Sequence, residues 1–347
     1  MRIAHLLWSL GTGGVETMIP EIMNEQSKEN DVSLFVINDW IVESILAKLN
    51  SSIKVYKTMR KEGSRNPLPI LKLNALLWSF RPDIIHTHSY QLINLVFYPF
   101  AKKVRTIHNT YNNEEEYPKY DALISISKSV WQFTKSQGFS SYIADNGISV
   151  SNIERNIHDV FADGKTHIIQ VSRLCVEQKG QDILLKALSI LKDVHKRNDF
   201  VMHFVGTGDD EQMLKKMTHD MGLEGNIVFE GLKSQNWVYG NLCNYDLFVQ
   251  PSRYEGFGLT VAEAIAACLP VLVSDIEGPM EIIENGKYGM HFRAADAADC
   301  ANKILAFMEK GRDEEQIENA LKHVSEKYDV KETAKKYTEI YHTILHS

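Results

Sequence analysis

The stretch over residues 251–270 constrains the fold of this chain more than any other. A short apolar run that ends at Gln250 fits a buried strand, and small and apolar residues recur at helical spacing after Gly258. Gly256 and Gly258 therefore predict a strand-to-helix turn. Such a turn points several backbone N–H groups of the helix toward one position, where the helix dipole also favours an anion such as a phosphate.

Two carboxylates flank this turn. Glu255 precedes it, and Glu263 follows eight positions later, inside the predicted helix. Because a carboxylate repels an anion, these side chains are better suited to accept hydrogen bonds from neutral hydroxyls, such as those of a sugar. The stretch is typical of a nucleotide-sugar site. Two glutamates on a solvated helix face are the alternative interpretation.

The length predicts two domains. A chain of 347 residues exceeds the usual size of one hydrophobic core, so two domains of about 150 to 170 residues are expected. The sequence is 44% hydrophobic and 24% charged, as in ordinary globular enzymes. Its net charge of −7 argues against a general nucleic-acid-binding protein.

The cysteine spacing and the hydropathy of the sequence predict the cellular location of the protein. Four cysteines are scattered along the chain: Cys175, Cys243, Cys268 and Cys300. Their spacing fits neither a zinc knuckle nor a redox pair, so reduced thiols in the cytoplasm are expected. The apolar N-terminal run lacks a small-residue cleavage site and predicts a first strand. No apolar run approaches the ~20 residues of a membrane-spanning helix, so membrane contact would be peripheral.

The N-terminal segment predicts the start of a doubly wound unit. Residues 3–10 fit a strand, a glycine loop with Gly13 and Gly14 follows, and residues 17–27 fit a helix. The loop is a poor dinucleotide-binding fingerprint, because Glu16 occupies its third glycine position. An NAD-linked oxidoreductase is the alternative interpretation, and this loop is the feature that favours it.

Two cations flank a predicted strand-to-helix loop in the second half. A strand that begins at Ile168 ends near Arg173, and a helix begins near Asp182, shortly after Lys179. An arginine binds a diphosphate through its planar fork and a lysine binds it as a point charge. This spacing favours a diphosphate clamp over two unrelated surface charges.

Three histidines stand on or after predicted strands of the first half. His86 and His88 share one face of a strand by the period of two. They could ligate zinc, but no cysteine or third histidine lies nearby in a ligand spacing, so no metal site is expected. His108 stands at the carboxyl end of the next strand, where doubly wound sheets place ligands. A packing role is the alternative for His108.

Together these motifs resemble those of the retaining GT-B glycosyltransferases of family 4, also called group 1 glycosyltransferases. The spacing of Glu255 and Glu263, the pair of Arg173 and Lys179, and the segment with His108 occur in that family's order. The resemblance covers nearly the whole chain. It implies an α/β fold of the GT-B type, with two Rossmann-like domains whose parallel sheets face a central cleft.

The resemblance also implies roles for individual residues. His108, Arg173, Lys179 and Glu255 would be catalytic: the two cations on the diphosphate and leaving oxygen, Glu255 on the donor sugar, and His108 near the attacked carbon. The donor-binding residues it implies are Gly13, Gly14, Gly206, Gly256, Phe257, Gly258, Leu259 and Glu263, the last on the ribose. The chain departs from the family at Ser172, where glycine is usual, and at Pro279, which has no N–H to offer a phosphate.

The domain limits follow from a polar, aperiodic segment and from the resemblance. Residues 156–165 predict a linker. An acceptor-side domain is expected over residues 1–160, a nucleotide-sugar-binding domain over 161–325, and a terminal helix over 326–347 that crosses back to the first domain. Apolar periodicity further predicts helices over residues 41–49 and 92–100, and Asp209 is expected to cap a helix together with Gln212.

The implied reaction is the transfer of a hexosyl group, with retention, from a nucleotide diphosphate sugar to an acceptor hydroxyl. A UDP-sugar is the favoured donor, and a saccharide or lipid-linked saccharide is the expected acceptor, in surface polysaccharide or glycolipid assembly. No Asp-x-Asp occurs in the sequence, so neither a metal nor another cofactor is expected. A nucleotide-sugar-binding protein without turnover is a further alternative.

A basic segment precedes an apolar helix in the first half. Residues 54–65 carry five basic side chains and one acidic side chain, and residues 71–80 predict the helix. Such a loop is suited to weak peripheral contact with anionic lipid. A solvated loop is the alternative.

Overall fold

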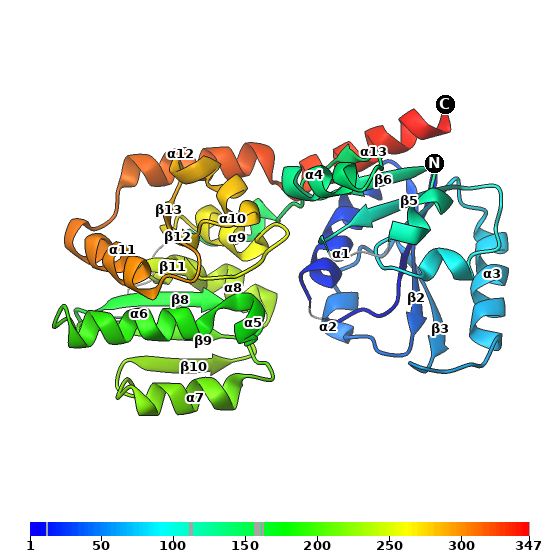
Figure 1. Cartoon of the computed structure of the whole chain (residues 1–347). Coiled ribbons are helices and arrows are strands. Elements are labelled where there is room, and N and C mark those ends of the chain that lie inside the picture. Colours follow the sequence, from blue (N-terminus) through cyan, green and yellow to red (C-terminus); the bar gives the residue numbers. More distant parts are fainter. Residues whose placement is uncertain (12, 111–113, 156–160, 162, 347) are drawn as a thin grey trace. The chain divides into compact units, whose positions relative to one another are not determined.

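The structure is a computed structural model that describes residues 1–11, 13–110, 114–155, 161 and 163–346. The chain divides into two compact units. Unit 1 comprises Met1–Ser149 and Tyr328–Ser347, and unit 2 comprises Val150–Lys327. Each unit is a parallel sheet with helices on both faces (Figure 1). The α/β prediction with two Rossmann-like units is therefore confirmed.

The sheet of unit 1 has the strand order β3-β2-β1-β4-β5-β6-β7, and all of its pairs are parallel. Its strands are β1 (Arg2–Leu7), β2 (Asp31–Asn38), β3 (Lys54–Arg60), β4 (Ile84–Thr87), β5 (Lys102–Ile107), β6 (Ala122–Ser125) and β7 (Tyr142–Ile143). The central strands are buried on both faces, which explains their nearly continuous apolar sequences. The direction of winding reverses between β1 and β4.

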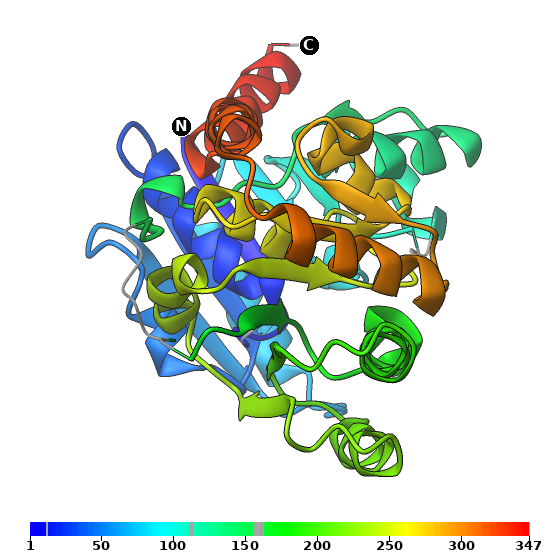
Figure 2. The same cartoon turned by 90° about the vertical axis from the view of Figure 1, so that its left-hand side faces the viewer.

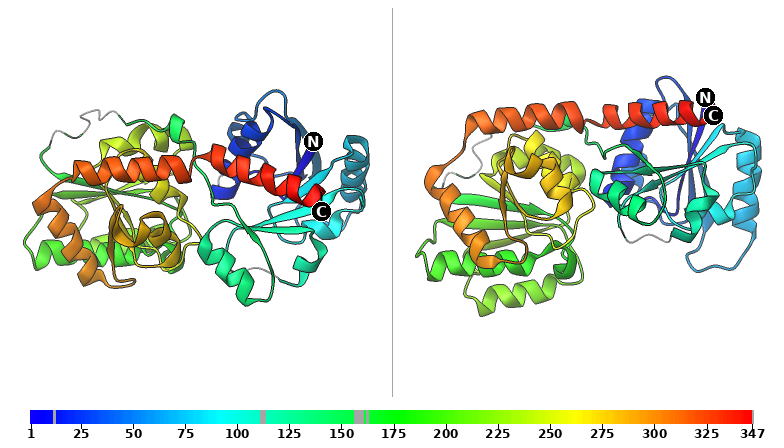
Figure 3. Two further views of the ribbon diagram at one scale, coloured as in Figure 1. Left: turned by 90° about the horizontal axis from the view of Figure 1, so that it is seen from above. Right: turned by 45° about the horizontal axis from the view of Figure 1, so that its top comes forward.

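The described residues of unit 1 form five α-helices: α1 (Gly14–Gln26), α2 (Glu43–Leu46), α3 (Leu68–Phe80), α4 (Lys128–Ser136) and α13 (Val330–Leu345). The last of these packs against α1, and the two views of Figure 3 show it beside the N-terminal strands of this unit. Asp329 caps α13 by accepting a hydrogen bond from the backbone N–H of Lys331. The backbone of Val330 is bonded to Ile148, so the C-terminal segment is joined to unit 1 just before that unit's main segment ends.

The sheet of unit 2 has the order β10-β9-β8-β11-β12-β13 and is again parallel throughout. Its strands are β8 (Thr166–Val171), β9 (Phe200–Val205), β10 (Ile227–Gly231), β11 (Leu247–Gln250), β12 (Val271–Ser274) and β13 (Met290–Phe292). Its helices are α5 (Val176–Lys179), α6 (Gln181–Asp193), α7 (Glu211–Asp220), α8 (Gln235–Asn241), α9 (Leu259–Ala266), α10 (Glu277–Ile282), α11 (Ala297–Lys310) and α12 (Glu314–Lys327). In Figure 2, where this unit faces the viewer, α6 and α11 pack against each other over a core rich in leucine and phenylalanine.

The structure moves the domain boundaries away from residues 160 and 325. The units meet in sequence at Ser149/Val150 and at Lys327/Tyr328. The first boundary comes earlier because the residues after it are already bonded within unit 2. Glu154 donates its N–H to the carbonyl of Tyr239, and the Arg155 guanidinium donates to the carbonyl of Ala266 at 3.0 Å. Residues 156–160 and 162 of the predicted linker lie outside the described residues.

Two helix predictions in unit 1 were wrong in extent. The helix expected over 41–49 is a four-residue turn, α2. The helix expected over 92–100 is one 3-10 turn, Leu92–Leu95, followed by an extended segment. Asn74 of α3 holds that segment: its amide donates to the carbonyl of Leu95 at 2.8 Å and accepts from the N–H of Phe97 at 2.6 Å. These tertiary hydrogen bonds replace the intrahelical ones that periodicity alone suggested.

The cap expected for α7 was also wrong. Asp210 occupies the N-cap position, not Asp209, and it makes no capping hydrogen bond. Its carboxylate instead accepts a hydrogen bond from the backbone N–H of Val176 at 2.7 Å. The side chain thereby ties the loop after β9 to the start of α5.

Candidate functional site

The winding of unit 2 leaves a topological switch point between β8 and β11. The chain proceeds from β8 outward to β9 and β10, and then returns to β11 on the other side of β8. Loops that follow two such strands diverge, and open α/β sheets bind ligands in the crevice between them. Arg173 and Lys179 follow β8, and Glu255 follows β11. The fold therefore places three of the predicted catalytic residues at the position where a ligand is expected.

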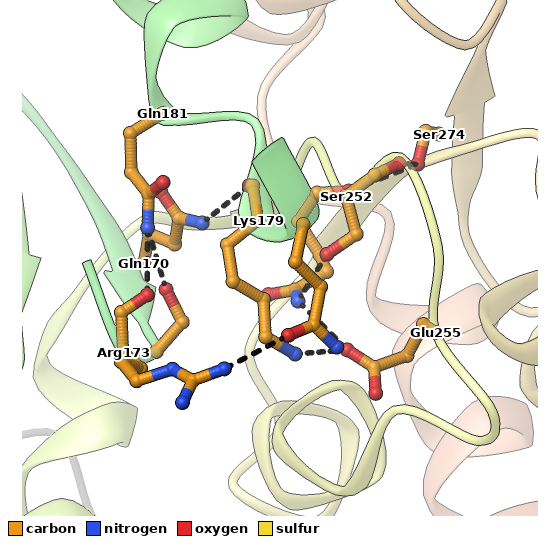
Figure 4. Close-up of polar contacts among 10 residues, drawn as sticks. Gln170, Arg173, Lys179, Gln181, Ser252, Glu255 and Ser274 are labelled. Atoms are coloured by element: carbon orange, nitrogen blue, oxygen red, sulfur yellow. Dashed lines mark hydrogen bonds and ion pairs between the residues drawn. The ribbon is translucent and has the colours of Figure 1, made fainter. Parts of the chain in front are cut away.

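Lys179 and Glu255 form an ion pair across this switch point (Figure 4). The lysine ammonium group contacts Oε2 of the glutamate, and the two side chains are 16% and 17% exposed. The Gln250 amide lies 3.5 Å from the same carboxylate oxygen. Because this pair is largely shielded from water, its charges interact more strongly than those of a surface salt bridge.

The two loops that carry this pair are bonded to each other. The N–H of Arg253 donates to the carbonyl of Gln178, and the Gln170 amide donates to the carbonyl of Lys179 at 3.2 Å. Gly180, with φ +67°, passes so close to Pro251 that a Cβ at this position would collide with the Pro251 carbonyl oxygen. A glycine is therefore required where Lys179 turns into α6.

A second ion pair, between Arg253 and Asp182, stabilises the loops that hold Lys179 and Glu255. The Arg253 guanidinium donates to both oxygens of Asp182, at 2.8 and 3.0 Å, and to the carbonyl of Val176 at 2.7 Å. Burial alone raises the pKa of the Asp182 carboxyl, but hydrogen bonds from Arg253 and Lys186 outweigh it and the pKa is lowered. The bidentate geometry fixes α5 and α6 against the loop that carries Glu255.

Arg173 is the more accessible of the two cations. It is exposed, and its guanidinium donates to the side-chain oxygen of Gln178 at 3.2 Å. Among the described residues it has no ion-pair partner. Gln181 fixes its backbone by donating to the carbonyl of Arg173 at 3.0 Å and to the Ser172 hydroxyl at 3.1 Å. Figure 4 shows Arg173 and Lys179 reaching toward the same region.

The glycine turn has the predicted form. Gly258, with φ +104°, is the N-cap of α9, which begins at Leu259. Phe257 is buried, so it can offer a ligand its backbone but little of its ring. Glu263 lies in α9 and is also buried. Gly206 directly follows β9, the strand that pairs with β8. Its N–H donates to the carbonyl of Gly231.

In unit 1 the predicted glycines follow β1, at the switch point between β1 and β4, and His108 follows β5, the next strand after β4. Gly13 is the N-cap of α1, and Gly14 is the first residue of that helix. His108 immediately follows β5. Burial, and to a smaller extent the charge of Arg105, lower the pKa of His108 to about 3. The imidazole is therefore neutral at physiological pH, and neither ring nitrogen has a hydrogen-bond partner among the described residues.

A third histidine, which the sequence interpretation missed, joins His86 and His88. Parallel pairing of β1 with β4 sets His5 opposite His86, and the His5 and His88 rings lie 2.9 Å apart from nitrogen to nitrogen. Nitrogen atoms of the three rings lie within 4.8 Å of one another, which is close enough to hold a metal ion. The prediction that no third histidine lies near His86 and His88 was therefore wrong, because His5 is distant in the sequence and approaches them only through strand pairing.

Hydrogen bonds already engage most of these ring nitrogens. The second nitrogen of His5 lies 2.8 Å from Oε1 of Gln26. His86 lies 2.5 Å from the Tyr341 hydroxyl and 2.7 Å from the Thr106 hydroxyl. These contacts make the three histidines part of a buried hydrogen-bonding network.

Two Rossmann-like units of parallel strands, with two cationic side chains at the switch point of the second, fit the GT-B class of glycosyltransferases. Residues 152–324 match the family model described as glycosyl transferases group 1. Residues 12–170 match the model described as glycosyltransferase family 4. The chain belongs to the group 1 glycosyltransferases.

Individual relatives match parts of the chain. It is 33% identical over 144 residues to a sucrose synthase from Denitrovibrio acetiphilus, covering 38% of this chain and 18% of the synthase. It is 27% identical over 208 residues to the poly(ribitol-phosphate) alpha-N-acetylglucosaminyltransferase of Staphylococcus aureus, covering 59% of this chain and 41% of the transferase. The chain thus spans less than half the length of these curated relatives.

A solved structure matches the whole chain. Anabaena Alr3699/HepE in complex with UDP and glucose has a TM-score of 0.81 and 18% sequence identity, over 97% of this chain and 98% of that one. At this identity the likeness shows the shared GT-B fold.

The two glutamates of the turn are expected to differ in function. Glu255→Ala should lower kcat about 10- to 100-fold with a smaller effect on UDP affinity, because one charge-assisted hydrogen bond to the sugar is lost. Glu263→Ala should weaken both UDP binding and turnover. Steady-state kinetics and calorimetric UDP titration measure the two quantities. Glu318→Ala, an exposed residue of α12, is the control, and equal effects of the two site variants would mean that their roles are wrongly assigned.

Proposed function

We propose that this protein is a retaining, metal-independent hexosyltransferase that uses a UDP-sugar. The acceptor would be a hydroxyl of a saccharide or lipid-linked saccharide, in surface polysaccharide or glycolipid assembly. The observation that carries the proposal is the pair Lys179–Glu255 with the accessible Arg173 beside it, at the β8/β11 switch point. Two cations serve the diphosphate there, and one carboxylate serves the sugar.

In the proposed reaction the bond between the anomeric carbon and the diphosphate oxygen breaks while the acceptor oxygen bonds to the same face of that carbon. Arg173 and Lys179 neutralise the charge that grows on the departing diphosphate. The proton of the acceptor hydroxyl passes to the departing oxygen. A covalent glycosyl-enzyme would need a carboxylate nucleophile at the attacked carbon. The proposal assigns Glu255 to the sugar hydroxyls instead, so it follows the direct front-face route.

The donor and acceptor classes are supported by the named relatives. Alr3699/HepE was crystallised with UDP and glucose. The Staphylococcus aureus relative is named for transfer of alpha-N-acetylglucosamine to poly(ribitol-phosphate). These names suggest a UDP-hexose and a surface glycopolymer for this chain.

A cytoplasmic location is part of the proposal. All four cysteines are free thiols, as expected in a reducing compartment.

A ligand panel tests the donor assignment. UDP and UDP-sugars at about 100 times Kd should raise the melting temperature of unit 2 by about 5 °C or more, whereas GDP, ADP and NAD should have little effect. Release of UDP from a UDP-sugar, with and without EDTA, then tests turnover and metal independence. Stabilisation by NAD alone would support the oxidoreductase alternative. Tight UDP binding without donor cleavage or transfer would support the binding protein, and loss of activity in EDTA would contradict metal independence.

A further inference from the structure

Unit 1 carries an apolar surface on α3 and on the extended segment that follows β4. Figures 1 and 3 show α3 on the outside of this unit. The large exposed side chains of this surface are Leu68 (65% exposed), Leu71 (59%), Trp78 (50%), Phe97 (63%) and Phe100 (72%). Isolated exposed apolar residues are normal, but a contiguous group of this kind marks an interaction site.

The exposed residues of α3 lie on one face of the helix. Leu68, Leu71, Ala75 and Trp78 are spaced by three, four and three residues, which aligns them along one stripe. The opposite face of α3 is also apolar and is buried in the core of the unit through Leu73 and other residues. A surface helix normally carries polar side chains toward solvent. An apolar outer face on α3 therefore has no explanation in the folding of unit 1.

Aromatic contacts join the helix and the extended segment into one surface. The Trp78 ring packs edge-on against Tyr98 and Phe100, with centroid distances of 5.2 and 5.7 Å. Asn74 bonds the backbone of the same segment to α3. Phe100 is thus held beside Trp78 by a ring contact, and the backbone of Phe97 is bonded to Asn74, four residues before Trp78 in α3.

The charge around this surface is opposite to that of the whole protein. Residues 63–82, which include α3, contain three basic side chains and no acidic one, in a chain with a net charge of −7. Arg65 and Arg81 are exposed on either side of α3, and Lys72 is exposed on the helix itself. Arg105 is buried against Glu116 at 3.2 Å and does not contribute to the surface.

The structure also corrects which basic residues are available. Residues 57–60 of the basic segment, expected to be loop, belong to strand β3. Arg60 donates to Asn38 and to the carbonyl of Ser64, and it lies over the Trp8 ring. It is therefore a structural residue, and the basic charges that flank the apolar face are Arg65, Lys72 and Arg81.

We propose that this surface, the α3 patch, binds peripherally to a bilayer that contains anionic lipid. The patch is defined by Leu68, Leu71, Trp78, Phe97, Phe100, Arg65, Lys72 and Arg81. Aromatic and leucine side chains enter the boundary between headgroups and acyl chains, while arginine and lysine bind anionic headgroups. None of the described helices is long and apolar enough to cross a membrane. The inference goes beyond the proposed transfer reaction and does not depend on it.

Vesicle sedimentation tests the patch without any substrate. The full-length protein should co-sediment with vesicles of phosphatidylglycerol and phosphatidylcholine, much less with phosphatidylcholine alone, and less in 1 M salt. Replacing Arg65, Lys72 and Arg81 with glutamine should weaken binding about fivefold per charge, or roughly 100-fold together. Leu71→Ser with Phe97→Ser should weaken it at least about tenfold. Neither of those two side chains makes a ring contact with Trp78, so these variants should fold.

Matched substitutions elsewhere separate the patch from general effects. Val194→Ser replaces an equally exposed apolar residue of unit 2, and Lys303→Gln replaces an exposed lysine of α11. Both should bind vesicles as the original protein does. Absence of vesicle binding, or equal losses in the control variants, would overturn the proposal. So would a dimer, seen by analytical ultracentrifugation, that dissociates on Leu71→Ser with Phe97→Ser while vesicle binding is absent. Donor cleavage is measured in a separate assay of UDP release. A protein that binds vesicles but releases no UDP would contradict the proposed reaction and not the membrane proposal.

Discussion

The Arg173→Ala/Lys179→Ala double variant is expected to lose donor affinity, and with it kcat/KM, by a factor of at least about 100. Each cation offers the diphosphate a charge-assisted hydrogen bond that contributes about 1.5 to 3 kcal/mol, and each 1.4 kcal/mol is about a factor of ten in affinity. Arg173 lies on the loop after β8 and Lys179 is the last residue of the short helix α5, so neither side chain is part of the core of unit 2. The fold should therefore survive both substitutions.

The ion pair makes the two single variants unequal. Lys179→Ala removes a cation and also leaves the Glu255 carboxylate without its partner, facing the incoming diphosphate. Arg173 has no carboxylate to release among the described residues. We therefore expect Lys179→Ala to weaken UDP binding more than Arg173→Ala. Removing the carboxylate as well, in Lys179→Ala/Glu255→Ala, should restore part of the UDP affinity that Lys179→Ala loses.

Isothermal titration with UDP and initial-rate kinetics measure these effects. Lys303→Ala, an exposed lysine on α11, is the matched control and should leave both unchanged. Unaltered donor affinity in the double variant would contradict the clamp. If Lys179→Ala/Glu255→Ala binds UDP no better than Lys179→Ala, the carboxylate does not oppose the diphosphate and the ion pair has another role.

The parts of the site that the sequence predicted are those encoded by local patterns. The buried strand that ends at Gln250, the glycine turn at Gly258 and the helix after it are specified by residues adjacent in the chain. The strand before Arg173 and the helix after Gly180 are encoded in the same way. These elements also set the fold class, because alternating strands and helices require a parallel sheet.

The parts that were missed depend on pairings between distant segments. Arg253 and Asp182 are 71 positions apart, and nothing in their local sequence indicates that they form a bidentate pair. His5 reaches His86 only through the register of β1 with β4. The helix expected over residues 92–100 failed because Asn74, in another element, binds the backbone of that segment. Tertiary contacts overrode a local preference there.

The histidines of unit 1 should make its stability strongly dependent on pH. Burial lowers the pKa of His5 to about 4 and, with the neighbouring histidines, lowers the pKa of His86 and His88 well below 6.5. The pKa of His108 is lowered to about 3. In the unfolded chain these groups have pKa values near 6.5. Below that pH the unfolded chain binds protons that the folded unit excludes.

The sign of the effect follows from linkage. The stabilisation is fully present above about pH 6.5, where both states are neutral, and it is lost as the pH falls toward the folded pKa values. Each histidine contributes a slope of up to about 1.4 kcal/mol per pH unit, so four contribute up to about 5 kcal/mol per unit. Since domains are stable by only about 5 to 15 kcal/mol, unit 1 should unfold near pH 5. Glu21, whose pKa is raised by burial, acts in the opposite sense.

Urea unfolding followed by tryptophan fluorescence, at pH 7.5, 6.5 and 5.5, measures this slope. Four of the five tryptophans, Trp8, Trp40, Trp78 and Trp131, report on unit 1. His86→Gln should reduce the slope by about 1.4 kcal/mol per pH unit, whatever it does to stability at pH 7.5, because one proton fewer is taken up on unfolding. His219→Gln, in unit 2, should leave the unit 1 transition unchanged. A free energy of unfolding that stays constant from pH 7.5 to 5.5 would show that the cluster is not held in its neutral form.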